Sequence, residues 1–112
     1  MDEVGWFSEN ANNITHPVGK KTANELGLHD MSGNVWEWCS DWYGEKYYEQ
    51  FRYKPAQNPH GPEKGESAVL RGGAWVANDD LCRIACRDWS YRVLSTDVIG
   101  LRLARAVSEG GR

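Results

Sequence analysis

The chain is poor in cysteine and proline and has no long hydrophobic run. Its 112 residues include three cysteines and four prolines. Cys39, Cys82 and Cys86 are odd in number and lack a Cys-x-x-Cys spacing, which excludes a fully paired disulfide framework and disfavours a zinc site. We expect buried thiols that pack as small hydrophobic side chains. A disulfide between Cys39 and one of the other two is the alternative.

The chain also lacks an excess of charge of one sign. Thirteen Lys and Arg residues are interspersed with sixteen Asp and Glu residues, for a net charge of -3. This pattern disfavours nucleic acid and anionic membranes as partners. No apolar run is long enough to span a bilayer, and residues 1–20 lack the apolar core of a signal peptide. We therefore expect no nucleic-acid partner and no membrane insertion, and the localisation stays unassigned.

No familiar arrangement of catalytic side chains occurs in the sequence. There is no Ser/His/Asp order and no glycine-rich phosphate loop, and the three histidines do not cluster. By themselves, the residues name no reaction.

Aromatic residues and glycine are abundant instead. Six tryptophans, five tyrosines and twelve glycines indicate a loop-rich domain whose core relies on a few large aromatic side chains. We expect a single domain over residues 1–112, of the α+β class, with a frayed polar tail from Ser108. The predicted elements are short antiparallel strands near 68–75, 81–87 and 99–105, a helical turn within 45–51, and a long loop over 54–67.

The segment over residues 30–38 organises the chain. Read as extended from Gly33 to Trp38, it places Trp36 and Trp38 on one face and Val35 and Glu37 on the other. The tryptophan face is predicted to be core. We expect four tryptophans to be largely buried: Trp36, Trp38, Trp42 and Trp75.

The same segment has the donors of a calcium site. The carbonyls of Gly33 and Val35 lie within reach of the carboxylates of Asp30 and Glu37, and calcium takes such mixtures of oxygens from short irregular loops. The EF-hand pattern is absent. The alternative is that Glu37 caps a turn or pairs with an arginine.

The three predicted strands carry specific expectations. The glycine pair at 72–73 predicts a kink where the backbone passes close to a bulky side chain, which we expect to be a central tryptophan. In the second strand Leu81, Arg83, Ala85 and Arg87 would share a face. In the third, Ile99, Leu101 and Leu103 would point inward, with Arg102 buried against a carboxylate or carbonyls.

Two irregular segments, 76–80 and 88–98, have the composition of a binding surface. Exposed tryptophan, tyrosine and arginine side chains on a rigid scaffold are typical of contact patches. Trp89, Tyr91 and Arg92 should contribute most to binding, with Asp79 and Asp88 adding polar specificity. The alternative is that Trp89 folds back onto the core. The predicted contact residues are Val76, Asn78, Asp79, Asp88, Trp89, Ser90, Tyr91 and Arg92.

Three motifs carry a resemblance to a known family: GLHDMSGNVWEW at 27–38, LRGGAW at 70–75 and IGLRLA at 99–104. The chain resembles the formylglycine-generating enzyme (sulfatase-modifying factor) family over about residues 4–106. The resemblance implies a variant of the C-type lectin fold, of which this chain is the C-terminal part. It also implies a structural calcium ion on Asp30, Gly33, Val35 and Glu37.

The resemblance implies two functions, and whether the chain is an enzyme is left undecided between them. One branch resembles a copper-dependent oxidase that converts a sulfatase cysteine to formylglycine. It carries two cysteines in the order Gly-Gly-Ser-x-x-Cys-x-x-x-x-Cys. Here Ala77 takes the first position, and the second falls either on Cys82 or in a segment that this chain lacks. Because Cu(I) selection rests on soft thiolates, we expect no copper.

The other branch is non-catalytic and is the one we favour. It includes the variable proteins of bacterial and phage diversity-generating retroelements, whose C-terminal segments present a variable binding surface. The implied function is that of a ligand-binding domain. Its partner would be a protein or a glycan on another cell surface. A displayed binding domain of this kind would lie at a cell surface or on a virion.

Overall fold

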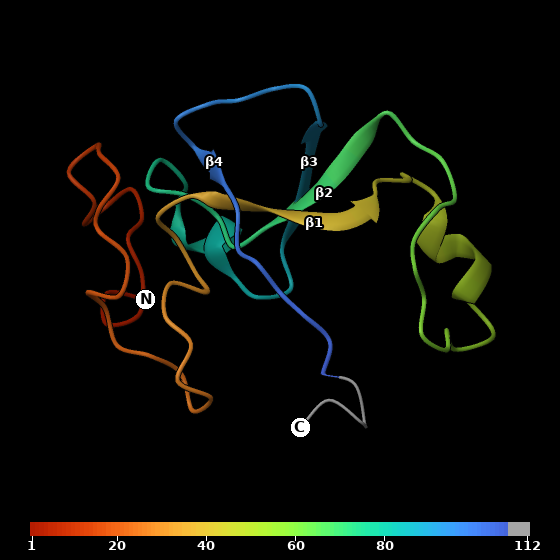
Figure 1. Cartoon of the computed structure of the whole chain (residues 1–112), viewed down its shortest axis with the longest axis horizontal. Helices are drawn as coiled ribbons and strands as arrows, with labels where there is room; N and C mark the ends of the chain where they lie inside the picture. Colours follow the sequence, from red (N-terminus) through yellow and green to blue (C-terminus); the bar gives the residue numbers. More distant parts are fainter. Residues whose placement is uncertain (108–112) are drawn as a thin grey trace.

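A computed structural model describes residues 1–107, and the tail expected to fray from Ser108 lies outside them. Its centre is a four-stranded sheet with strand order β3-β2-β1-β4 (Figure 1). Strand β2 runs antiparallel to β1 and to β3, whereas β4 runs parallel to β1. The strands are β1 (Trp36–Trp42), β2 (Ser67–Arg71), β3 (Arg87–Tyr91) and β4 (Ile99–Gly100).

Within residues 1–107, helical structure is limited to two short 3-10 helices, η1 (Tyr47–Phe51) and η2 (Asp79–Cys82). The helical turn expected within 45–51 is thus present as η1. No helix within residues 1–107 is long and apolar enough to cross a membrane. Figure 1 shows the irregular N-terminal segment at one end of the sheet and the segment that contains η1 at the other.

Strand β1 fixes the core as its alternation predicts. Trp36 is 6% exposed and packs with Leu70 and Ala74, and Trp38 packs against the same cluster. Both tryptophans therefore lie on one face, which confirms the expectation. Trp38, Trp42 and Trp75 are half-buried rather than buried.

The reason for the partial burial of Trp42 is its position along the strand. Trp38 pairs with Leu70, which belongs to the core cluster. Trp42 pairs with Ala68 after an irregularity in β1, further along β2 from the cluster. Of the four tryptophans expected to be largely buried, Trp36 is buried and the other three are partly buried.

The glycine pair ends β2 at Arg71. Gly72 and Gly73 have φ angles of 100° and 75°, in the left-handed region that glycine adopts without strain. A Cβ placed on Gly73 would lie 2.5 Å from Sγ and 2.8 Å from Cα of Cys82. The bulky side chain expected beside the glycine pair is therefore Cys82 and not a tryptophan, because the turn at Gly73 packs directly against η2.

The strand predicted at 81–87 is wrong, and β3 begins only at Arg87. Residues Asp79–Cys82 form η2, because the side chain of Asn78 accepts a hydrogen bond from the backbone N–H of Leu81 and caps the helical turn. Residues 83–86 then form a turn that leads into β3. The alternation over 81–87 therefore does not correspond to a strand.

The strand predicted at 99–105 is also wrong in length and direction. It consists of Ile99 and Gly100, and it runs parallel to β1 rather than antiparallel to a neighbour. Leu101 and Leu103 are 70% and 89% exposed instead of pointing inward. The chain leaves the sheet after Gly100, because Arg102 turns toward Glu37 and nearby carbonyls.

Asn34 holds the N-terminal segment against the sheet. Its φ angle is 68°, and its backbone N–H donates to the carbonyl of Trp6. Its side chain accepts from the backbone N–H of His16 and donates to the carbonyl of the same residue. Its carbonyl accepts from the N–H of Trp75. The loop that precedes β1 is thereby fixed in place.

Candidate functional site

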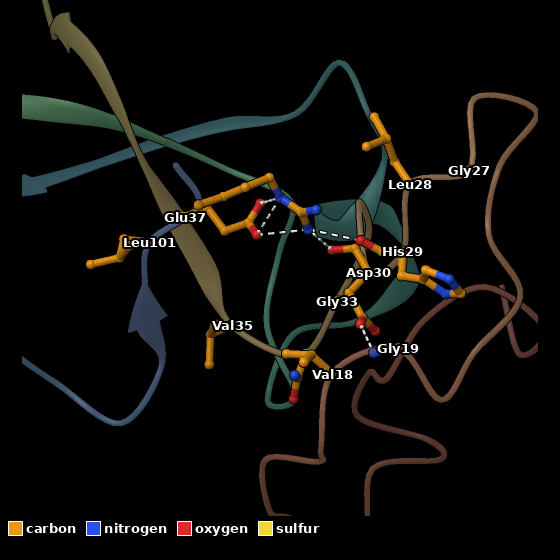
Figure 2. Close-up of a pocket in the computed structure, with 12 residues that line it drawn as sticks. Val18, Gly19, Gly27, Leu28, His29, Asp30, Gly33, Val35, Glu37 and Leu101 are labelled. Atoms are coloured by element: carbon orange, nitrogen blue, oxygen red, sulfur yellow. Dashed lines mark hydrogen bonds and ion pairs between the residues drawn. The ribbon is translucent and has the colours of Figure 1, made fainter. Parts of the chain in front are cut away.

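A cavity of about 450 Å³ lies between this loop, the start of β1 and the segment after β4 (Figure 2). The four residues predicted to bind calcium all contribute to its wall. The lining residues are Val18, Gly19, Gly27, Leu28, His29, Asp30, Gly33, Asn34, Val35, Glu37, Leu101 and Arg102.

Asp30 contributes a buried carboxylate to this cavity. The residue is 7% exposed and has a φ angle of 56°. Oδ2 accepts a hydrogen bond of 2.8 Å from the N–H of Gly19. Within residues 1–107, Oδ1 is buried and has no hydrogen-bond partner. An unpartnered buried acceptor costs about 1–3 kcal/mol, which a bound cation would offset.

Glu37 contributes the second carboxylate, and it is held by Arg102. Nη2 of Arg102 lies 2.9 Å from Oε1 of Glu37, and Nε donates to both carboxylate oxygens. Nη2 also donates to the carbonyls of His29 and Asp30 (Figure 2). Glu37 thus pairs with an arginine, and Arg102 contacts a carboxylate and carbonyls as expected. The arginine side chain is 36% exposed, however, and not buried.

The donor set of this cavity suits a hard cation such as calcium. Asp30 supplies an unpartnered oxygen, and two carboxylates against one guanidinium leave a net negative charge. The part of the chain that the structure describes contains no cluster of three or more His, Cys, Asp or Glu side chains. A cation here would therefore complete its shell with backbone carbonyls, and Gly33 and Val35 both line the cavity.

The predicted contact residues of β3 divide between the two faces of the sheet. Trp89 and Tyr91 are 46% and 48% exposed and meet edge to face, with ring centroids 6.2 Å apart. Trp89 also stacks on Tyr43 at 5.7 Å. The alternative in which Trp89 folds back onto the core is therefore wrong. These aromatic side chains line a shallow hollow together with Glu45, Glu66 and Ser67.

Within β3, Asp88 and Ser90 alternate with Trp89 and Tyr91 and therefore point to the other face. Arg92 follows the end of the strand. The guanidinium of Arg92 lies 3.9 Å from the ring centroid of Trp42 and donates to the carbonyl of Ser40. Asp88 is exposed and accepts a hydrogen bond from the N–H of Trp89. Ser90 is half-buried beside them.

The other predicted segment, 76–80, lies apart from these side chains. Val76, Asn78 and Asp79 are exposed and follow the Arg71 end of β2. Tyr91 pairs with Ser67 at the opposite end of β2, about 13 Å away at the rise of an extended chain. The predicted contact residues are therefore divided among the two faces of the sheet and the segment 76–80, and they do not form one surface.

The positions of the oxidase cysteine pair fall in the interior. Ala77 and Cys82 pack with Phe7 in one buried cluster, and Cys82 is 1% exposed. Burial raises the pKa of the Cys82 thiol. All three cysteines are free thiols, so the alternative disulfide of Cys39 does not form.

A second cavity, which the sequence did not indicate, lies against the outer face of the sheet beside η1. Its wall includes Arg71 and Arg87, which the sequence pattern had placed in different strands without suggesting that they meet.

Comparisons with known proteins place these features in context. Residues 3–107 match the family model of the sulfatase-modifying factor enzyme 1-like domain. The chain is 39% identical over 100 residues to a formylglycine-generating enzyme of Streptomyces coelicolor, covering 87% of this chain and 31% of that protein. It is 42% identical over 105 residues to the serine/threonine-protein kinase pkn1 of Chlamydia caviae, covering 94% of this chain and 16% of that protein.

A solved structure is similar as well. Treponema denticola variable protein 1 superposes with a TM-score of 0.79 and 32% identity, covering 89% of this chain and 35% of that chain. The likeness confirms the α+β, C-type-lectin-like fold class expected from the sequence. The chain spans about a third of the length of the formylglycine-generating enzyme and of the variable protein, and less of the kinase.

Proposed function

Because the chain belongs to the family of sulfatase-modifying factor enzyme 1-like domains, we propose that it is a non-catalytic ligand-binding domain on a C-type-lectin-like scaffold. The proposal rests on the residues found at the two positions that align with the oxidase cysteines when no gap is allowed. Ala77 offers a methyl group, and Cys82 is a buried thiol whose pKa is raised by that burial.

A buried thiol beside a methyl group is unsuited to the oxidase chemistry. The reactive species and the soft copper ligand is the thiolate, and burial in apolar surroundings keeps Cys82 protonated. Cys86 packs in the other core cluster, with Trp36 and Leu70. This supports a binding role in place of copper-dependent oxidation.

The exposed aromatic side chains support the same proposal. Trp89, Tyr91 and Tyr43 form a contiguous aromatic surface, and such groups dominate the energetics of contact patches. The proposed partner is a protein or a glycan on another cell surface, and a displayed domain of this kind would lie at a cell surface or on a virion. The similarity to a variable protein supports this class of function.

Calcium is proposed as the structural ion of the scaffold. Asp30 and Glu37 would hold it through carboxylate oxygens, and Gly33 and Val35 through carbonyls. The unpartnered Oδ1 of Asp30 supports this assignment. The ion would fix the loop before β1 and so the placement of Trp36.

A second function is favoured by one observation, the 39% identity to a formylglycine-generating enzyme. In this alternative the chain forms part of a copper-dependent oxidase or of another sulfatase-modifying enzyme. Two assays on the purified chain separate the functions. We expect no formylglycine when copper-loaded protein is incubated with a sulfatase-type cysteine peptide, and turnover would overturn the binding proposal.

The second assay measures binding to arrays of glycans and surface proteins. A hit of the wild-type chain should be lost in the double variant Trp89→Ala, Tyr91→Ala. The matched control is Tyr53→Ala, which removes a tyrosine that is 92% exposed and outside the patch. Binding that survives the double variant would move the site to another surface.

A further inference from the structure

The second cavity has a volume of about 330 Å³, within the range of about 300–1,000 Å³ that small-molecule sites occupy. We call it the arginine cavity. None of the residues assigned above to calcium or to the predicted contact surface lines it. Its wall consists of Cys39, Asp41, Trp42, Tyr47, Tyr48, Pro59, Gly61, Pro62, Val69, Arg71 and Arg87.

Two arginines face each other across neighbouring strands of this wall. Arg71 of β2 and Arg87 of β3 are direct register partners. Like charges in that position repel each other, and an anion between them would remove the repulsion. Neither arginine forms an ion pair within residues 1–107. Glu37, the partner of Arg71 on β1, directs its carboxylate to Arg102 instead.

Both guanidinium groups are held in place and still have unused donors. Nη1 of Arg71 donates to the carbonyl of Ile84 at 2.8 Å. The guanidinium of Arg87 lies 4.6 Å from the ring centroid of Tyr48 and 5.7 Å from that of Tyr43. A guanidinium has five N–H donors in a planar fork that matches a carboxylate. Prepositioned forks bind such groups at a small entropic cost.

The remaining groups keep the cavity positive in charge. Burial raises the pKa of the Cys39 thiol, which is therefore neutral at neutral pH. Asp41 is the acidic residue of the wall, and its Oδ1 accepts a hydrogen bond from the hydroxyl of Ser40. Two arginines against one aspartate leave an excess of one positive charge.

The rest of the wall is mainly aromatic and apolar. Tyr47 and Tyr48 approach from η1 with ring centroids 6.3 Å apart, and the hydroxyl of Tyr47 accepts a hydrogen bond from the N–H of Gly61. Trp42, Pro59 and Pro62 complete this side. Aromatic and proline surfaces of this kind pack against the face of a ring.

We propose that the arginine cavity binds a small ring-shaped carboxylate. Its carboxylate contacts Arg71 and Arg87, and its ring packs against the aromatic wall. Two classes of small molecule combine a ring with a carboxylate in this way, acidic sugars and aromatic acids. The site does not depend on the function proposed for Trp89 and Tyr91.

The test is calorimetric titration of the whole chain in a buffer of low chloride concentration. The probes are glucuronate with glucose as its neutral counterpart, and benzoate with benzyl alcohol. We expect one acid to bind and its neutral counterpart not to bind, and the acid that binds identifies the class. Arg87→Gln should weaken binding at least tenfold, because it removes one of two charge-assisted contacts.

Two further variants make the result specific. Arg87→Lys keeps the charge and loses the fork, so it should also weaken binding. Arg52→Gln removes an exposed arginine outside the cavity and should leave binding unchanged. Thermal unfolding of each variant confirms that it is folded.

Three outcomes overturn the proposal. They are binding of neither acid in preference to its neutral counterpart, unchanged binding in Arg87→Gln, and an equal loss in Arg52→Gln, which would indicate a general effect of net charge.

Discussion

Arg102 and Glu37, which are 65 residues apart in sequence, form the ion pair that joins the C-terminal segment to β1. The same guanidinium donates to two carbonyls of the loop before β1. One side chain thereby fixes three parts of the chain around the proposed calcium site.

Arg102→Gln should lower the free energy of unfolding by about 1 kcal/mol. Partly exposed ion pairs contribute about 0–1 kcal/mol, and the two bonds to carbonyls add to this. The measurement is urea unfolding at low and at high salt, with Arg105→Gln as the control. The effect should shrink in high salt. A loss in Arg105→Gln as large as in Arg102→Gln would contradict this account.

Calcium should raise the midpoint of thermal unfolding. A ligand at 100 times its Kd adds about 2.7 kcal/mol to the stability of a folded protein. Asp30→Asn should abolish the response, because it replaces the carboxylate that carries the unpartnered oxygen. Asp97→Asn, at an exposed position outside the cavity, should keep it. If the midpoint of thermal unfolding changed neither when calcium is added nor when it is chelated, calcium would not be a structural ion of this fold.

Gly73→Ala should destabilise the fold more than Gly27→Ala does. Both glycines have φ angles near 75–79°, so both substitutions carry a backbone cost of about 1–2 kcal/mol. A Cβ at Gly27 meets nothing within 4 Å, whereas one at Gly73 meets Cys82 and the carbonyl of Leu81. Overpacking adds about 1–3 kcal/mol. Chemical denaturation measures the difference, and equal losses would mean that the contact with Cys82 is relaxed easily.

The free energy of unfolding should fall in alkaline solution because of two thiols, Cys82, which is buried, and Cys39, which is partly buried. Burial raises the pKa of Cys39 and of Cys82 above the ordinary value of 9.0. Above pH 9.0 the unfolded thiols ionise while the folded thiols stay protonated, so the contribution is full below that pH and is lost as pH rises through the folded pKa. The measurement is the free energy of unfolding at pH 7.5 and at pH 10. Its decrease between the two pH values should be smaller in Cys82→Ala than in the wild-type chain. A loss of equal size in that variant would assign the effect to other groups.

The sequence alone predicted those features of the fold that depend on residues close together in the chain. Alternation placed Trp36 and Trp38 on one face because successive side chains of a strand point in opposite directions. The glycine pair ended β2 because Gly72 and Gly73 adopt left-handed angles. The short spacing from Asp30 to Glu37 brought all four predicted calcium ligands to one cavity.

Tertiary structure alone decided the features that depend on distant residues. The alternation over 81–87 predicts a strand, but the cap by Asn78 is a competing local signal that favours a helical turn there. Only the pairing of Arg87 with Arg71 depends on the folded sheet. The same pairing brings Arg71 and Arg87 to the wall of one cavity. The register between strands is set by loop lengths and by the whole sheet, so the pairing of Arg71 with Arg87 cannot be predicted from either segment alone. The ion pair between Glu37 and Arg102 likewise joins residues that only the folded chain brings together.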